Sequence, residues 1–170
     1  MWQYTGTHRP DFAIAPGDGE ESVWDYPRPP ALVDYAKLIE VRAGDQLLAR
    51  TRRSKRVLET ASPPTIYIGP ADINFDLLQP VGGSSICEWK GAAAYWGLAG
   101  DHAGQAIGWS YPAPRPAFSA IRDCLCFYPA RVECYVDGER VRPQEGGFYG
   151  GWVTHDIVGP WKGAPGTSHW

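Results

Sequence analysis

Short runs of alternating apolar and polar residues recur along the first half of the chain. Lys37–Arg42 and Gln46–Arg52 flank the turn Ala43-Gly44-Asp45, and this pattern predicts a β-hairpin. Val57–Thr60 and Thr65–Ile68 are two further predicted strands, because the second is rich in β-branched and aromatic residues and follows a Pro-Pro stop. The first half therefore reads as a series of short strands.

The centre of the chain continues this pattern after a loop at Gly82-Gly83. Ser84–Trp89, Ala92–Leu98 and Gln105–Tyr111 are predicted strands, with a tight turn at Gly100-Asp101 between the last two. Helical character is limited to single turns, which we expect within the segments 70–78 and 116–122.

A last hairpin is predicted to join Cys124–Tyr128 to Arg131–Val136 around Pro129-Ala130. Asp137-Gly138 is a strong turn dipeptide and leads into Arg140–Arg142. About eight or nine short strands at close spacing favour a mostly β fold, a compact antiparallel barrel or sandwich.

The two ends of the chain predict extended arms around this core. Residues 1–35 contain the proline and aromatic segment Trp24–Pro30, and residues 143–170 alternate glycine with large aromatic side chains. Because exposing such side chains to water is costly, we expect the arms to pack on the core domain, residues 36–142, or on a second copy of the chain. The chain is thus predicted to be one domain, with a homo-oligomer through the arms left open.

Composition narrows the class of protein. The 170 residues are 44% hydrophobic and 21% charged, as expected for a folded globule with a real core. A net charge of -3 argues against a general nucleic-acid or membrane-surface binder. No targeting signal and no run of the ~20 apolar residues that a membrane helix needs is evident. We therefore expect a cytoplasmic protein, in which the four cysteines are free thiols.

The segment Cys87–Tyr111 carries the first candidate chemistry, a lysine and a thiol among aromatic residues. Strand alternation places Cys87 and Lys90 on opposite faces unless Gly91 forms a bulge. Glu59 is the carboxylate that we pair with Lys90, which would bind an anionic group or act as an acid or base with a lowered pKa. The alternative is a structural Lys–Glu pair that bridges two strands.

Cys87 is a weaker candidate, a nucleophile that Lys90 would activate, and its alternative is an inert buried thiol. The ligand-binding residues that we predict are aromatic: Tyr67, Trp89, Trp109 and Tyr111. These side chains would fill the core, or wall a cavity that suits a flat or aromatic small molecule.

No metal and no cofactor is predicted. The chain has no Cys-x-x-Cys pair, its histidines are scattered, and its thiols do not converge in the simplest register of the last hairpin. The run Arg50–Arg56 holds five cations, which would suit a phosphate-bearing ligand or, alternatively, a solvated sheet edge protected by charge.

Several motifs resemble those of a bacterial family, the domain of unknown function numbered 427, also labelled nucleotidyltransferase-like. One is Cys87-Glu88-Trp89-Lys90-Gly91. The matching segments are 21–30, 57–60, 67–72, 87–91, 95–96, 109–112, 127–128, 136–139 and 147–152. The resemblance implies a compact complex-β fold, similar to small β domains that include zinc-bearing exchange-factor-like proteins and a methionine sulfoxide reductase class. Likeness of fold does not transfer chemistry.

Three functions are compatible with these observations. The first is a small-molecule-binding protein or an enzyme, with its site around Lys90 and Glu59. The second is an interaction module whose arms form a homodimer. The third is a nucleotidyltransferase, for which the sequence shows no Gly-rich phosphate loop and no evident metal–carboxylate centre.

Overall fold

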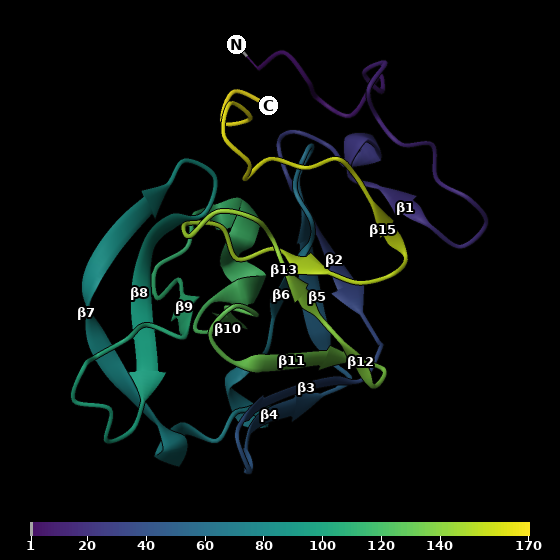
Figure 1. Cartoon of the computed structure of the whole chain (residues 1–170). Helices are drawn as coiled ribbons and strands as arrows, with labels where there is room; N and C mark the ends of the chain where they lie inside the picture. The colour runs from purple at the N-terminus through teal and green to yellow at the C-terminus, as the bar shows by residue number, and fades with distance from the viewer. Residues whose placement is uncertain (1) are drawn as a thin grey trace.

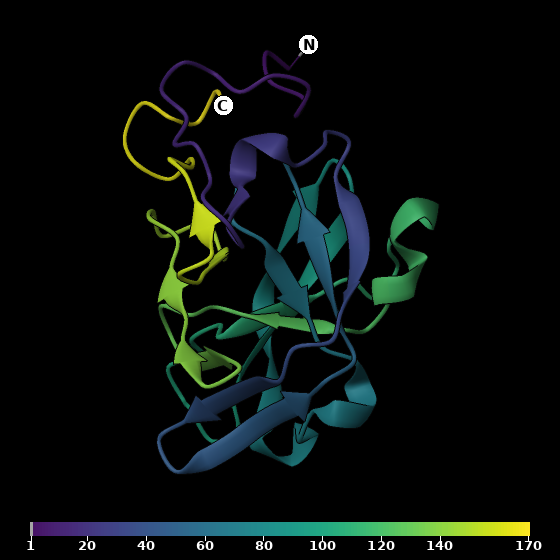
Figure 2. The same cartoon turned by 90° about the vertical axis from the view of Figure 1, so that its right-hand side faces the viewer.

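The computed structural model describes residues 2–170, and most of its regular structure is β (Figure 1). The strands form several small sheets that pack on one another in a sandwich-like arrangement, and within the described residues no sheet closes into a barrel. The predicted fold class, mostly β and largely antiparallel, is confirmed. Both termini lie at the same end of the molecule (Figures 1 and 2).

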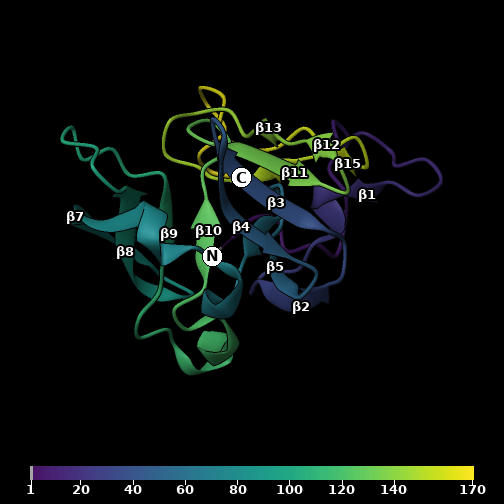
Figure 3. The same cartoon turned by 90° about the horizontal axis from the view of Figure 1, so that it is seen from below.

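Two four-stranded sheets form the main body. The first has the order β10-β9-β8-β7 and consists of β7 (Leu78–Cys87), β8 (Gly91–Leu98), β9 (Gly108–Ser110) and β10 (Leu125–Phe127). The second has the order β12-β11-β3-β4 and consists of β3 (Ile39–Ala43), β4 (Gln46–Thr51), β11 (Glu133–Val136) and β12 (Glu139–Arg140). Seen from below, β7 and β8 stand on one side of the molecule, away from β3 and β11 (Figure 3).

Smaller elements complete the fold. A three-stranded sheet has the order β2-β5-β6, formed by β2 (Ala31–Tyr35), β5 (Ser54–Leu58) and β6 (Thr65–Tyr67). Two pairs follow: β13 (Arg142–Pro143) with β14 (Trp152–Val153), and β1 (Glu21–Ser22) with β15 (Ile157–Val158), which are parallel. Residues 2–170 contain four 3₁₀ helices: η1 (Val23–Asp25), η2 (Pro70–Asp72), η3 (Phe75–Leu77) and η4 (Pro116–Ile121). The helical turns expected within 70–78 and 116–122 are therefore confirmed.

The predicted hairpin of Cys124–Tyr128 with Arg131–Val136 is wrong. β10 pairs with β9, with Cys126 opposite Trp109, and β11 pairs with β3 in the other sheet. The reason is that both edges of β10 are already occupied. On the side away from β9, Leu125 exchanges two backbone hydrogen bonds with Ile68, at 2.8 and 2.9 Å. The chain therefore crosses to the second sheet instead of folding back on itself.

The loop predicted at Gly82-Gly83 is also wrong, since β7 runs through it as a single strand of ten residues. The register with β8 shifts between Val81 and Ser85, and Gly83 has a φ of +102°. A left-handed residue in a strand is a position that glycine accepts at little cost. The two glycines thus make a bulge within β7 rather than a loop that begins it.

The ends of the chain pack on each other. The ring of Phe12 stacks on that of Trp170 at 5.0 Å, and Trp24 lies edge-on to Trp170 at 5.4 Å. The Trp24 indole donates a hydrogen bond to the Pro160 carbonyl at 2.8 Å. These contacts, together with the β1–β15 pair, bury Trp24 and cover part of Trp170, while Phe12 keeps 45% of its surface exposed.

The core consists of three apolar clusters, of which one borders the site. The first lies under β3, β4 and β11, and the third is the aromatic packing of the chain ends. The second cluster contains Tyr67, Trp109, Tyr111, Phe118 and Cys126, all buried. Among the described residues, no helix is long and apolar enough to cross a membrane.

Candidate functional site

The site begins at the hairpin turn between β7 and β8. Cys87 pairs with Gly91, so Glu88, Trp89 and Lys90 form the turn itself. Gly91 has a φ of +109°, a conformation that favours glycine, and a Cβ there would lie 3.4 Å from the Ala113 carbonyl. The expected continuous strand Ser84–Trp89 is therefore wrong at its end, and the alternation argument that separated Cys87 from Lys90 does not apply.

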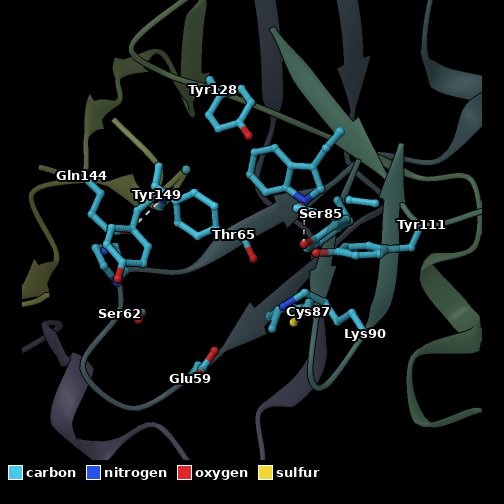
Figure 4. Close-up of a pocket in the computed structure, with 18 of the residues that line it drawn as sticks. Glu59, Ser62, Thr65, Ser85, Cys87, Lys90, Tyr111, Tyr128, Gln144 and Tyr149 are labelled. Atoms are coloured by element: carbon cyan, nitrogen blue, oxygen red, sulfur yellow. Dashed lines mark hydrogen bonds between the residues drawn. The ribbon is translucent and has the colours of Figure 1, made fainter. Parts of the chain in front are cut away.

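A cavity of about 220 Å³ lies beside this turn, between β5, β6, the first sheet and the C-terminal segment (Figure 4). Figure 4 shows Gln144, Tyr149 and Ser62 on one side of it, and Ser85, Tyr111 and Lys90 across from them. The side chains that line it are mostly aromatic or apolar, with a few polar groups: Glu59, Ser62, Thr65, Ser85, Cys87, Lys90, Gln144 and Lys162. This composition is typical of a small-molecule site.

Aromatic rings form the wall on the first sheet and β6. The Trp109 indole donates a hydrogen bond to the Tyr67 hydroxyl at 3.3 Å, and the two rings meet edge-on. Tyr128 lies against Trp109 with a centroid distance of 4.6 Å. Burial raises the pKa values of Tyr67 and Tyr111, and raises the pKa of Tyr128 to about 12. These phenols therefore stay protonated and can donate hydrogen bonds at neutral pH.

The opposite wall is a glycine-rich segment, residues 146–151. Gly150 packs so closely on the Trp109 ring that a Cβ would lie 2.3 Å from its Cη2 atom. Gly151 donates its backbone N–H to the Gln144 side-chain oxygen at 3.1 Å. Phe148 also lines the cavity but is 74% exposed, so it stands at the mouth.

Lys90 is the first of two buried cations at the cavity. Only 8% of the residue is exposed, and its Nζ lies 5.8 Å from the ring centre of Tyr111 and 5.9 Å from that of Phe118. Its backbone carbonyl is held by the N–H of Arg115 at 3.0 Å. Within residues 2–170, no carboxylate lies within 4.0 Å of the Lys90 Nζ.

Glu59, the partner that we predicted for Lys90, also lines the cavity but pairs with Arg28 at 3.3 Å. Arg28 is buried, and besides this ion pair it donates hydrogen bonds to the carbonyl of Thr60 at 2.8 Å and to that of Tyr4 at 3.2 Å. The expected Lys90–Glu59 pair is therefore wrong: the two residues share the cavity, but an arginine from the N-terminal region holds the carboxylate.

Lys162 is the second buried cation, with 9% of the residue exposed. Its backbone N–H donates to the Ala61 carbonyl, and its own carbonyl accepts from Gln144 at 2.7 Å. The Nζ lies over the rings of Trp2 and Tyr149, at 5.5 and 5.9 Å, and no described carboxylate lies within 4.0 Å. Burial lowers the pKa of Lys162; the Glu59 charge opposes this shift, and the nearby charges of Arg28 and Lys90 add to it.

The predicted site residues thus divide into two groups. Glu59, Tyr67, Cys87, Lys90, Trp109 and Tyr111 all line the cavity. Trp89 does not, because its ring packs from the turn against the second apolar cluster and its buried indole nitrogen has no hydrogen-bond partner among the described residues. Cys87 is a half-buried free thiol.

The cysteines and the cationic run Arg50–Arg56 are the other two features that could form a site. All four cysteines are free thiols, and residues 2–170 contain no group of three His, Cys, Asp or Glu side chains placed to hold a metal ion. In the run Arg50–Arg56, Arg53 pairs with Asp72 at 2.8 Å and Arg56 with Glu21 at 3.1 Å. The expected sheet edge holds only for β4, because β5, which carries Lys55 and Arg56, is the central strand of its sheet.

A family model described as "Domain of unknown function (DUF427)" matches residues 31–138, well over half of the chain. The chain belongs to the DUF427 family. The resemblance inferred from the motifs is therefore confirmed, and the short name of the family model, NTP_transf_9, carries the same nucleotidyltransferase label. No curated protein matches the chain.

The DUF427 segment contains only part of the cavity. Glu59, Tyr67, Cys87, Lys90 and the aromatic wall of Trp109 and Tyr111 lie within residues 31–138. Gln144, the glycine-rich wall and Lys162 follow it in the chain, and Arg28 precedes it. We did not identify Arg28, Gln144 or Lys162 as site residues from the sequence. For Lys162 the sequence offered one signal, a lysine among glycines and aromatics in a segment that we expected to pack on the core.

Proposed function

We propose that this DUF427 protein binds a small organic anion with an aromatic or apolar body in the cavity beside Lys90. One observation carries the proposal: two lysines, each about nine-tenths buried, line an aromatic cavity and have no carboxylate within 4.0 Å among residues 2–170. The two amines are not fully buried themselves but open on the cavity, where an unpaired charge beside apolar walls is costly. A bound anion would supply the missing partner.

The shape and chemistry of the walls support the rest of the assignment. Trp109, Tyr111 and Tyr67 offer flat apolar faces, and their hydroxyl and indole groups are partly used in binding one another. An anion would lie toward Lys90 and Lys162, while a ring or alkyl group would lie against these side chains. Exposed Ile86 and Phe148 at the rim extend the apolar surface outward.

Matched ligands test this proposal. We expect phenyllactate to raise the melting temperature in a thermal-shift assay and its primary amide, which lacks the charge, to have little effect. Lys90→Ala should keep the far-UV circular dichroism of the folded protein and weaken phenyllactate binding by roughly 10- to 100-fold, because a hydrogen bond to a charged group is lost. Lys55→Ala, which removes a surface lysine paired with Asp34, is the control.

The contrary outcomes are distinct. Equal binding of the acid and the amide would remove the anion from the proposal, and unfolding of Lys90→Ala would make Lys90 a structural residue. Magnesium nucleotide belongs in the same calorimetric panel, because the family label names nucleotidyl transfer. Heat with nucleotide that Lys90→Ala abolishes would favour that function over a small organic acid.

Self-association is a second candidate function, favoured by one observation. Phe12 and Ile14 on the N-terminal arm keep 45% and 55% of their surface exposed, although the aromatics around them pack within the chain. Light scattering of the full chain should then give the mass of a dimer that Phe12→Ser with Ile14→Ser returns to a monomer. A monomer at all concentrations for the unaltered chain would contradict this.

A further inference from the structure

The four lysines of the chain fall into two pairs with different surroundings. Lys37 and Lys55 lie at the surface and pair with Asp156 at 3.2 Å and Asp34 at 2.5 Å. Lys90 and Lys162 are buried at one cavity without a carboxylate partner among residues 2–170. The chain has three times as many arginines as lysines, yet both cavity cations carry a primary amine.

The surroundings of Lys162 favour a reactive amine. Its side chain lies among Trp2, Tyr149 and the cavity walls, and two cations, Arg28 and Lys90, act on it. Burial beside apolar groups and nearby positive charge both favour the neutral amine over the ammonium ion, in agreement with the lowered pKa of Lys162. These are the conditions under which a lysine becomes a nucleophile toward carbonyl compounds. An arginine could not do this, because its guanidinium stays protonated.

We infer that the Lys162 Nζ forms a reversible imine with the carbonyl group of an organic anion held by Lys90, and that the ligand is a 2-oxo acid with an aromatic or apolar substituent. This inference rests on the anion site proposed above. It adds a division of labour between the two lysines: Lys90 binds the carboxylate, and Lys162 bonds to the carbonyl carbon.

The step is balanced without any further reactant. The neutral amine of Lys162 adds to the carbonyl carbon, and a proton moves from nitrogen to oxygen to give a carbinolamine. The carbinolamine then takes up one proton, equal to the one that the lysine ammonium gave to solvent on becoming neutral, and loses its hydroxyl group as water, so that the C–O bond is replaced by the C=N bond of a protonated imine. An ammonium ion and a ketone thus become an iminium ion and one water molecule, and hydrolysis reverses the step.

Two features of the cavity fit a 2-oxo acid. The carbonyl of such an acid is adjacent to its carboxylate, so one ligand carries both groups for which the two cavity amines are proposed. The substituent beyond the carbonyl would meet the aromatic wall, which favours phenylpyruvate over pyruvate.

Borohydride trapping tests the inference directly. The full chain is incubated with phenylpyruvate and sodium borohydride, and intact-mass and peptide mass spectrometry locate the product. We expect one adduct per chain, with the mass of the ligand less one oxygen atom, on Lys162. Phenyllactate, which has the same ring and carboxylate but no ketone, should bind and leave no adduct. Lys162→Arg should lose the adduct, and Lys55→Arg should keep it.

The outcomes separate the two proposals. Phenyllactate binding without a phenylpyruvate adduct would overturn the imine and keep the anion site. Failure of both compounds to bind would overturn both. An adduct on Lys90, or equal labelling of Lys37, Lys55 and Lys162, would also overturn the assignment, and peptide mapping of the unaltered chain shows this even if a variant fails to fold.

Discussion

Two groups of positive charges, those of the run Arg50–Arg56 and those at the cavity, differ in whether a carboxylate lies beside them. In the run Arg50–Arg56, partly exposed cations meet carboxylates, as Arg53 meets Asp72 and Lys55 meets Asp34. At the cavity, Lys90 and Lys162 are far more buried and have no such partner among residues 2–170. For these four cations, pairing is present where water makes it nearly unnecessary and missing where the side chain is more buried.

Because of this difference, we propose the cavity rather than the run Arg50–Arg56 as the functional region. The run Arg50–Arg56 concentrates five cations in the sequence, but ion pairs between partly exposed side chains contribute little to stability. A bound anion would offset the energetic cost of the two lysine charges that open on the cavity. Charge density along the chain is thus a poorer guide to a site than the balance of charge within a buried volume.

Arg28 provides the strongest contrast, because it is both buried and paired. Arg28→Met would leave Glu59 without its cation and two carbonyls without a donor, so we expect a loss of about 3–5 kcal/mol in the free energy of unfolding. Urea denaturation measures this. Arg9→Met is the matched control, since Arg9 pairs with Asp25 on the surface and its loss should leave the midpoint almost unchanged. Similar small effects of both changes would contradict the contrast.

Lys162→Met should act in the opposite direction. Methionine fills a similar volume without a charge, and replacing a buried charged group by an apolar one is often stabilising. We expect a gain of about 1–2 kcal/mol in the free energy of unfolding of the ligand-free protein, with loss of the phenylpyruvate adduct. Lys55→Met, the surface control, should change stability by less than about 0.5 kcal/mol. A loss of stability in Lys162→Met comparable to that of Arg28→Met would show that Lys162 is a structural cation.

How far the sequence predicts this site depends on how local each feature is. Alternation and turn residues placed most strands, and the aromatic content of strands near Lys90 pointed to Tyr67, Trp109 and Tyr111 as wall residues. These inferences succeed because the side chains of one strand share a face over a few residues. The hairpin of β10 with β11 failed because pairing depends on whether an edge is free, and Ile68 occupies that edge from far away in the sequence.

The cavity lysines show the same limit. The prediction that Cys87 and Lys90 lie on opposite faces assumed a continuous strand, whereas Glu88–Lys90 forms the turn. Lys162 reaches the cavity because its backbone forms hydrogen bonds with Ala61 and Gln144. A periodic pattern in the sequence does not predict such contacts between separate segments. Which carboxylate meets which cation is likewise decided by packing between distant segments, so Arg28 rather than Lys90 holds Glu59.

The smallest expected effect is the pH dependence of the Lys162→Met gain. Burial lowers the pKa of Lys162 in the folded protein below its ordinary value of 10.5, which we take for the unfolded chain. At a pH between the folded and the unfolded pKa, the unfolded chain therefore binds more protons than the folded one. The stability of the unaltered protein relative to Lys162→Met should then rise with pH in that window, and the advantage of methionine should shrink. The buried phenols of Tyr67 and Tyr111, whose pKa values are raised, destabilise both proteins alike as pH passes about 10, and this cancels in the difference. Urea midpoints of both proteins at about pH 7, 8.5 and 10 measure the trend. A gap that stays constant or widens toward alkaline pH would mean that Lys162 titrates normally, and it would remove the main chemical reason for assigning the imine to this amine.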